Sequence, residues 1–199
     1  MDDRRYWQKR HQTIGDLRVV GCANKSAAEN AAEYTRAGAR FLELVTIDLP
    51  HAARRTVLDI GYGLGHYARL CKTAGFEEYV GVDFAAPPGP DLGPRYTYQQ
   101  ADAGALLTLG RRFDLVIAID VLFHLTDDRR FNTALDNIRT HTRPGGIVYA
   151  TGRFQEARTA SHVVHRGLER FTGLGELIAV ESWRDTSIAR IRTQAHGPQ

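Results

Sequence analysis

Short apolar runs alternate with amphipathic segments from residue 56 onward. The apolar runs have the length of strands, and the segments between them have the spacing of helices. Strands that alternate with helices in this way predict a parallel sheet with crossover helices. The predicted strands are residues 56–61, 78–84, 96–102, 113–120 and 147–152, and the predicted crossover helices are residues 66–75 and 127–143.

The two ends of the chain have their own patterns. Apolar residues recur every three or four positions from Ser26 to Val45, which predicts a helix with Ser26 as its N-cap. Near the C-terminus we expect a helix over residues 160–171. Two alternating strands follow at residues 176–183 and 187–194, and the short polar stretch between them predicts an antiparallel hairpin.

Prolines and glycines interrupt the pattern twice. Pro144, Gly145 and Gly146 are expected to end a helix just before the strand at Ile147–Ala150. The segment 85–95 is too rich in proline to form a crossover helix, so we expect a loop there. The sheet face that this helix would have covered then needs another cover. We expect either the segment around Tyr6 and Trp7 or a second subunit, which makes a homodimer a possibility.

Composition narrows the function classes. Of the 199 residues, 43% are hydrophobic and 25% are charged, which is typical of a globular protein with one core. The formal net charge of +3 is too small to indicate a nucleic-acid partner. Cys22 and Cys71 form no disulfide framework, and the sequence shows no signal peptide and no membrane anchor. We therefore expect a cytoplasmic protein.

A glycine-rich motif lies between the first predicted strand and the first crossover helix. It contains Asp59, Gly61, Gly63 and Gly65 at every second position. Glycines there let the backbone approach a ligand next to a helix N-terminus. A dinucleotide-binding fingerprint requires a small residue directly after Gly65. This position is occupied by His66, so the motif departs from that fingerprint. The motif resembles the first motif of class I S-adenosylmethionine-dependent methyltransferases, and this resemblance implies S-adenosyl-L-methionine as the cofactor.

Later motifs follow in the order that this family has, over about residues 55–152. Asp83 ends the second strand, where a carboxylate can accept hydrogen bonds from ribose hydroxyls, with Phe84 beside it. The resemblance places Asp102 and Ala103 at the adenine, and Asp120 and Val121 beside the methionine portion. Tyr62 departs from the family, which has a small residue at this position, and is expected to narrow the cofactor pocket.

Histidines and one arginine are the candidates for the acceptor side. His124 follows the fourth strand and is the best-placed general base, with an ordinary pKa near 6.5, although a purely structural role is the alternative. His162 and His165 would share a helix face and line the acceptor pocket, while a metal pair is disfavoured because no carboxylate is near. Arg36 either meets the cofactor carboxylate or is a solvated surface residue.

The sequence thus predicts an α/β protein with a Rossmann-like three-layer sandwich. Its mostly parallel seven-stranded sheet carries a C-terminal antiparallel hairpin. We expect a single methyltransferase domain over residues 1–199. Within it, residues 1–50 cover the site, residues 55–152 bind the cofactor, and residues 153–199 form the C-terminal helix and hairpin.

The expected activity is methyl transfer to a hydroxyl or amine of a small-molecule acceptor, such as a sugar, a natural-product intermediate or a small amine. The alternatives are a nucleic-acid or protein methyltransferase and a cofactor-binding subunit without activity of its own. The absence of a basic stripe and of a motif for flipped bases argues against nucleic acid.

Overall fold

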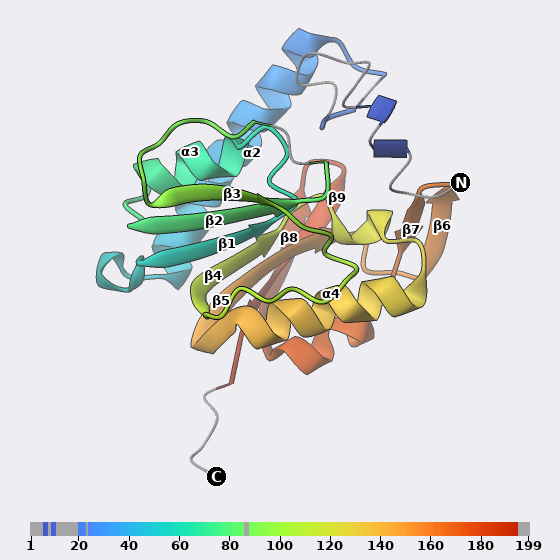
Figure 1. The fold of residues 1–199 in the computed structure, drawn as a ribbon. Coiled ribbons are helices and arrows are strands. Elements are labelled where there is room, and N and C mark those ends of the chain that lie inside the picture. The colour runs from blue at the N-terminus through green and yellow to red at the C-terminus, as the bar shows by residue number, and fades with distance from the viewer. Residues whose placement is uncertain (1–5, 8, 11–19, 23, 86–87, 195–199) are drawn as a thin grey trace.

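A seven-stranded sheet forms the centre of the protein in a computed structural model, which describes residues 6–7, 9–10, 20–22, 24–85 and 88–194. Five neighbouring strands are parallel, and β9 and β8 extend the sheet as an antiparallel hairpin (Figure 1). The strand order is β3-β2-β1-β4-β5-β9-β8. The strands are β1 (Thr56–Ile60), β2 (Glu78–Asp83), β3 (Tyr96–Gln100), β4 (Phe113–Ala118), β5 (Thr142–Gly152), β8 (Glu176–Trp183) and β9 (Thr186–Arg192). The expected fold class is confirmed.

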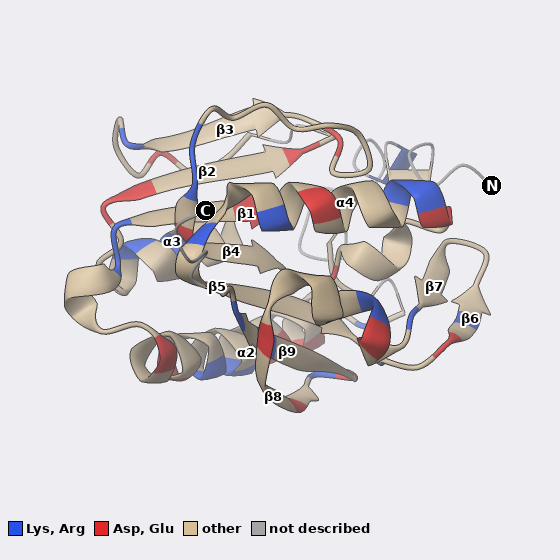
Figure 2. Ribbon diagram, turned by 90° about the horizontal axis from the view of Figure 1, so that it is seen from below, with Lys and Arg blue, Asp and Glu red and all other residues tan. Residues whose placement is uncertain are grey.

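Helices cover both faces of this sheet. The helices α2 (Ala27–Asp48) and α3 (His66–Thr73) pack on one face. The helix α4 (Asp128–His141) and the 3-10 helix η4 (Leu168–Leu174) pack on the other, and Figure 2 shows α4 crossing that face with charged residues on its outer side. The three layers follow from amphipathic helices that bury one side against a sheet whose central strands are buried on both faces.

The structure confirms Ser26 as the N-cap of α2. The Ser26 side chain accepts a hydrogen bond from the Glu29 N–H, and the Glu29 carboxylate accepts one from the Ser26 N–H at 2.8 Å. This reciprocal arrangement is a capping box, which satisfies two backbone donors that the first turn of a helix leaves without partners. The helix therefore begins where the sequence placed it.

The connection between β2 and β3 contains no helix among its described residues, as expected. The sheet face beside it is covered by a different segment from the one expected. A Cβ atom on Gly89 would lie 2.5 Å from the Tyr98 ring, and one on Gly65 would lie 2.3 Å from Pro90. The proline-rich loop itself therefore lies against β3 and the start of α3. Tyr6 and Trp7 do not cover this sheet face, because their rings contact His162 and His124 instead, and the alternative of a second subunit stays a prediction.

The expected helix over residues 160–171 is also wrong. The chain there forms a small hairpin of β6 (Ala157–Ala160) and β7 (Val163–His165), followed by η4. The run is short, and β-branched Val163 and Val164 favour extended backbone. Arg166 then fixes the exit of the hairpin, because its buried guanidinium donates to Asp128 at 2.9 Å.

The boundary between α4 and β5 differs from the one predicted from the sequence. The helix α4 ends at His141 and β5 already begins at Thr142, so Pro144–Gly146 lie inside the strand as the structure assigns it. The pairing with β4 is irregular there, because Phe113 faces Thr142 whereas Leu115 faces Ile147. The proline and glycines thus occupy a bulged strand entry, where a missing ladder hydrogen bond is tolerated.

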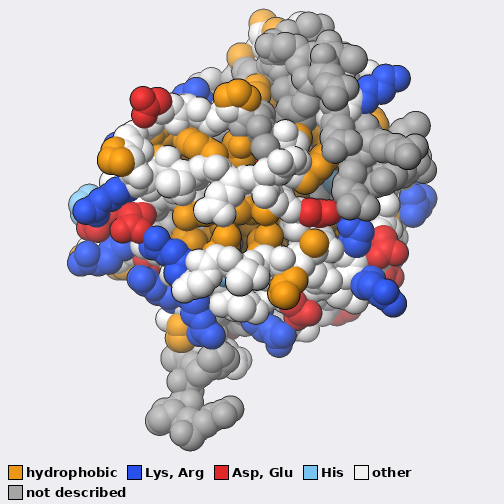
Figure 3. All heavy atoms as spheres, in the orientation of Figure 1, with side chains coloured by type: hydrophobic (Ala, Val, Ile, Leu, Met, Phe, Trp, Pro, Cys, Tyr) orange, Lys and Arg blue, Asp and Glu red, His pale blue; other side chains and the backbone are white. Residues whose placement is uncertain are grey.

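The surface carries both signs of charge. On the face in Figure 3, hydrophobic side chains gather in the middle, and basic and acidic side chains lie interspersed around them. Within the described residues, no helix combines the length and the apolar character that crossing a membrane requires.

Candidate functional site

The glycine loop between β1 and α3 leaves no room for a side chain at Gly61 or at Gly63. Gly61 has a φ of 79°, and a Cβ atom there would lie 2.2 Å from Val121. Gly63 has a φ of 52°, and a Cβ atom there would lie 2.9 Å from Val20. Both the left-handed backbone and the close approach require glycine. The side chains of Val121 and Val20 therefore pack directly against the loop backbone.

Acidic residues lie at the carboxyl ends of three parallel strands, β2, β3 and β4. Asp83 ends β2 and accepts hydrogen bonds from the Gly63 N–H at 3.1 Å and the Ala85 N–H at 2.9 Å. Asp102 follows β3, and Arg130 of α4 donates to both of its carboxylate oxygens at 2.9 and 3.0 Å. The third, Asp120, follows β4. Parallel strands thus bring these carboxylates to one edge of the sheet, where ligands bind in open α/β folds.

A cavity of about 1000 Å³, including the space at its open mouth, lies at this edge. Its lining is mainly apolar with a few polar groups, which is typical of a small-molecule site. Most of the residues predicted from the sequence line it: Gly61, Gly63, Asp83, Phe84, Asp102, Ala103, Asp120, Val121 and His124. The structure thus brings together residues from four loops that lie up to about 60 positions apart.

Asp59 and Gly65 do not line the cavity. Asp59 is buried below the loop and accepts a hydrogen bond from the Tyr79 hydroxyl. Burial raises the pKa of Asp59 to about 7, although the Tyr79 hydrogen bond opposes the shift. Gly65 is the N-cap of α3 and contacts Pro90. Both residues support the loop from outside the cavity.

Tyr62 lies in the cavity wall, as its position in the loop suggested. Its ring is 5.0 Å from the Tyr98 ring. Gly81 in β2 makes room for it, because a Cβ atom there would lie 2.9 Å from the Tyr62 ring. The bulky side chain is therefore accommodated by a glycine on the neighbouring strand.

His124 has an environment that the sequence did not indicate. It ends the short 3-10 helix η3 (Leu122–His124), and its Nδ1 lies 3.0 Å from the carbonyl oxygen of His162. Because a carbonyl can only accept, Nδ1 carries the proton and Nε2 keeps the lone pair. Burial lowers the pKa of His124 to about 3, against the raising effect of the His162 carbonyl. The expectation of an ordinary pKa near 6.5 is wrong.

His162 and His165 do not share a helix face. They belong to the turn and second strand of the β6–β7 hairpin. The His162 ring stacks on Tyr6 at 4.0 Å and lies parallel to His124 at 5.7 Å, whereas His165 lies 5.1 Å from Phe123. Neither histidine lines the cavity. Among the described residues, no group of three histidines, cysteines or carboxylates is arranged to hold a metal ion.

The N-terminal segment supplies cavity residues that sequence reasoning missed. Trp7 packs edge-on against His124 at 4.7 Å, and Val20 lies over Gly63. The buried Asn30 side chain holds the segment, because it accepts from the Cys22 N–H at 2.8 Å and donates to the Cys22 carbonyl at 3.0 Å. The sequence contains one signal for this arrangement, because Asn30 lies on the apolar stripe of the predicted helix. A buried amide at such a position must find hydrogen-bond partners.

Arg36 lies away from the cavity. It is exposed on α2, in a separate groove beside the β8–β9 turn. The arginine that lines the cavity is Arg130, and Arg184 contacts the cavity residue Asp120, to which it donates at 2.7 Å. Of the two alternatives for Arg36, the structure agrees with the solvated surface residue, because Arg36 is exposed on the side of α2 that faces this groove.

Two polar atoms in the cavity wall have no hydrogen-bond partner among the residues that the structure describes. They are the Tyr67 hydroxyl and Nε2 of His66, and both are buried. A buried donor or acceptor without a partner costs about 1 to 3 kcal/mol. These atoms therefore suit a polar ligand group at the end of the cavity between α2 and α3.

The chain is similar to known methyltransferases. A sequence model described as a methyltransferase domain matches residues 27–189. No curated protein sequence gives a significant match.

Among solved structures, N-methyltransferase NodS from Bradyrhizobium japonicum WM9, in complex with S-adenosyl-L-homocysteine, matches with a TM-score of 0.66 and 18% identity, over 97% of this chain and 99% of that one. An O-methyltransferase family protein from Burkholderia thailandensis has a TM-score of 0.60 and 15% identity, over 98% and 71%. The glycopeptide N-methyltransferase MtfA, complexed with S-adenosyl-L-methionine, has a TM-score of 0.56 and 16% identity, over 81% and 94%.

Proposed function

The chain belongs to the methyltransferase domain family and is an S-adenosylmethionine-dependent methyltransferase, and we propose that it methylates an amine of a small molecule. S-adenosylmethionine supplies a methyl group that is already activated as part of a sulfonium. The protein then needs chiefly to align a nucleophile with that group. The acceptor class therefore depends on the few polar groups at the acceptor end of the cavity.

The cavity fits the cofactor. Gly61 and Gly63 of its glycine loop leave no room for a side chain, and their backbone lines the ligand space together with His66 and Tyr67 at the start of α3. The Asp83 carboxylate accepts two backbone hydrogen bonds and lines the cavity at the end of β2, where a carboxylate can accept hydrogen bonds from ribose hydroxyls. The unpartnered Tyr67 hydroxyl and His66 Nε2 suit the polar methionine end. Asp102, Ala103, Asp120 and Val121 complete the proposed binding wall.

The state of His124 carries the proposal of an amine. A hydroxyl acceptor has to lose its proton during the transfer, and an efficient base for that step has a pKa near the working pH. His124, with a pKa of about 3, is too weak a base for this role. An amine attacks through its own lone pair when it is neutral, and a hydrogen bond from its N–H to Nε2 of His124 is enough to orient it.

The likeness to N-methyltransferases gives weaker support for the same acceptor class. NodS and MtfA are both described as N-methyltransferases, and NodS matches nearly the whole chain. Identities of 18% and 16% establish a shared fold rather than a shared substrate. The proposal therefore depends on His124 first and on these relatives second.

Matched acceptors test this proposal. The purified protein is incubated with S-adenosylmethionine carrying a deuterated methyl group and a panel of small molecules in amine and alcohol pairs. Mass spectrometry then identifies the labelled product, and we expect label on amines. Label on the alcohols alone contradicts the amine proposal. Calorimetric binding of NADH in place of S-adenosylhomocysteine contradicts the cofactor assignment itself.

A further inference from the structure

Arg184 occupies a turn position where glycine is the usual residue. It begins the two-residue turn between β8 and β9, in which Trp183 pairs with Thr186, and it has a φ of 51°. A two-residue hairpin turn with a positive φ at its first position is normally formed with glycine there. The local backbone preference therefore disfavours arginine, and its contacts have to offset this cost.

Asp120, the partner of Arg184, has a backbone of the same kind. Its φ is 58°, and Arg184 Nη1 donates to its Oδ2 at 2.7 Å. The described residues with a positive φ other than glycines are Asp120, Arg184 and Phe154. Two of these three positions thus belong to one ion pair at the cavity wall. A strained backbone at both ends of one contact indicates that the contact has a function.

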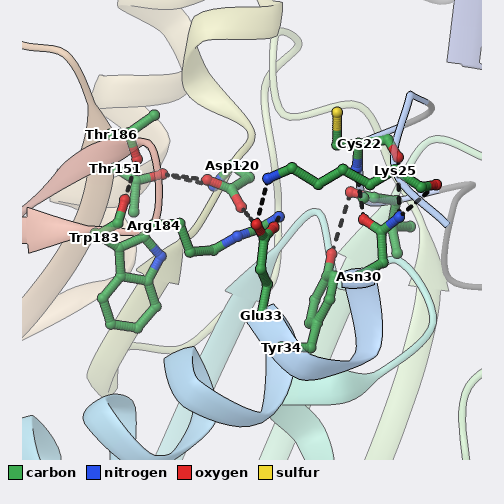
Figure 4. Close-up of polar contacts among 12 residues, drawn as sticks. Cys22, Lys25, Asn30, Glu33, Tyr34, Asp120, Thr151, Trp183, Arg184 and Thr186 are labelled. Atoms are coloured by element: carbon green, nitrogen blue, oxygen red, sulfur yellow. Dashed lines mark hydrogen bonds and ion pairs between the residues drawn. The ribbon is translucent and has the colours of Figure 1, made fainter. Parts of the chain in front are cut away.

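The ion pair joins three separate parts of the fold (Figure 4). Besides Asp120 at the end of β4, the Arg184 guanidinium contacts Glu33 of α2 at 3.5 Å and lies 4.9 Å above the Tyr34 ring. Only 11% of the Arg184 side chain is exposed. Thr151 of β5 holds the other carboxylate oxygen of Asp120 at 3.1 Å and accepts the Asp120 N–H at 2.7 Å. Asp120 therefore has a single orientation.

The charge of Asp120 depends on this partner. Burial raises the pKa of Asp120, while the Arg184 charge and the Thr151 hydrogen bond oppose that rise. The other described groups that interact with the pair or its neighbours are Glu33 and Tyr34 of α2, Lys25 beside them, His66 and Tyr67 of α3, and Asp185 of the turn. Asp185 raises the pKa of Asp120 further. Among the described residues, Arg184 is the cation that contacts Asp120 directly.

We propose that Arg184 is a positioning residue that holds the Asp120 carboxylate charged and fixed at the cavity wall, so that Asp120 can accept hydrogen bonds from the cationic amino group of the cofactor. This inference rests on the proposed function. The two contacts above leave Asp120 with unused lone pairs, and the cavity is lined by this residue. The C-terminal hairpin, distant from the cofactor motifs in sequence, thereby becomes part of the binding site.

The substitution Arg184→Gly separates this role from hairpin stability, because glycine suits the backbone of this turn. The matched control is Arg40→Gln. Arg40 ties the same two elements, α2 and β8, through Glu181, and it makes no contact with Asp120 in the structure. Both variants lose one positive charge. A difference between them therefore reports the contact with Asp120 rather than net charge or hairpin docking.

Calorimetry with S-adenosylhomocysteine from pH 6 to pH 8.5 is the readout. We expect Arg184→Gly to bind roughly tenfold to a hundredfold more weakly, and Arg40→Gln to bind as the wild type does. Without Arg184 the pKa of Asp120 is higher, so the charged form is lost at a higher pH as the pH falls. The defect of Arg184→Gly should therefore grow toward pH 6. Asp120→Asn should be weak at every pH and lack this dependence.

Equal affinities and equal pH profiles for Arg184→Gly and Arg40→Gln would overturn the positioning role. A wild-type protein that fails to bind S-adenosylhomocysteine would instead overturn the proposed function. The melting temperature of each variant is measured as well, to detect a loss of stability. If Arg184→Gly melts well below Arg40→Gln, Arg184→Lys replaces it, because lysine retains the charge, and this variant should then recover most of the affinity at pH 8.5.

Discussion

The two ends of the cavity are built in different ways. At the glycine-loop end, backbone and short strand-end residues form the wall, and the contacts follow from the order of the strands. At the His124 end, side chains from three remote segments meet: Trp7, η3, and the β6–β7 hairpin. The first end depends on local geometry that tolerates almost no substitution. The second depends on long-range packing, which the surrounding sequence does not specify locally.

The largest effect is expected at the backbone-built end. Gly61→Ala adds a Cβ atom that would lie 2.2 Å from Val121, on a backbone with a φ of 79°. Overpacking of this kind typically costs about 1 to 3 kcal/mol, and the left-handed backbone adds roughly 1 kcal/mol more. We expect a lower melting temperature and an affinity for S-adenosylhomocysteine reduced at least about a hundredfold.

Gly110→Ala is the control for this prediction. Gly110 also has a positive φ, of 65°, but a Cβ atom there meets nothing within 4 Å. It carries the conformational cost without the clash. If Gly61→Ala binds the ligand no worse than Gly110→Ala, the loop is not the close-approach surface that we describe.

An intermediate effect is expected at Asp83, where backbone and ligand share one carboxylate. Asp83→Ala removes a charge-assisted acceptor and also frees the Gly63 N–H, so S-adenosylhomocysteine binding should weaken by roughly 1 to 3 kcal/mol. Calorimetry measures this loss. Asp91→Ala is the control, because Asp91 is exposed and accepts from a backbone N–H in the same way, at Gly93. Similar affinities for the two variants would exclude Asp83 from the ligand site.

The difference between the two ends also explains how far the sequence could be interpreted. The positions of Gly61, Asp83 and Asp120 follow from strand–loop–helix spacing, which is visible in a stretch of about 100 residues. Trp7 lies more than 100 positions from His124, and Arg184 lies 64 positions from Asp120. No local sequence pattern indicates contacts between residues so far apart in the chain. The β6–β7 hairpin was missed for a related reason, since a short apolar run fits a helix or a strand equally well until its neighbours are known.

The smallest effect is expected at the packing-built end, for His124→Ala. If His124 only orients the acceptor through one hydrogen bond, its loss should lower kcat by about tenfold and leave S-adenosylhomocysteine affinity nearly unchanged. His162→Ala is the control, because the contact to His124 Nδ1 comes from the His162 backbone carbonyl, which this substitution keeps. Stopped assays with the methylated product quantified by mass spectrometry give both rates.

The pH profile decides between an orienting histidine and a general base. A base with an ordinary pKa makes the rate fall as the pH drops through about 6.5, because the imidazole becomes protonated. With the pKa of His124 lowered to about 3, the neutral ring persists from pH 8 down to pH 5. The wild-type dependence on His124, taken as the ratio of wild-type to His124→Ala rates, should then be flat over this range. A loss of a hundredfold to ten-thousandfold together with a limb near pH 6.5 would restore the general base and, with it, a hydroxyl acceptor.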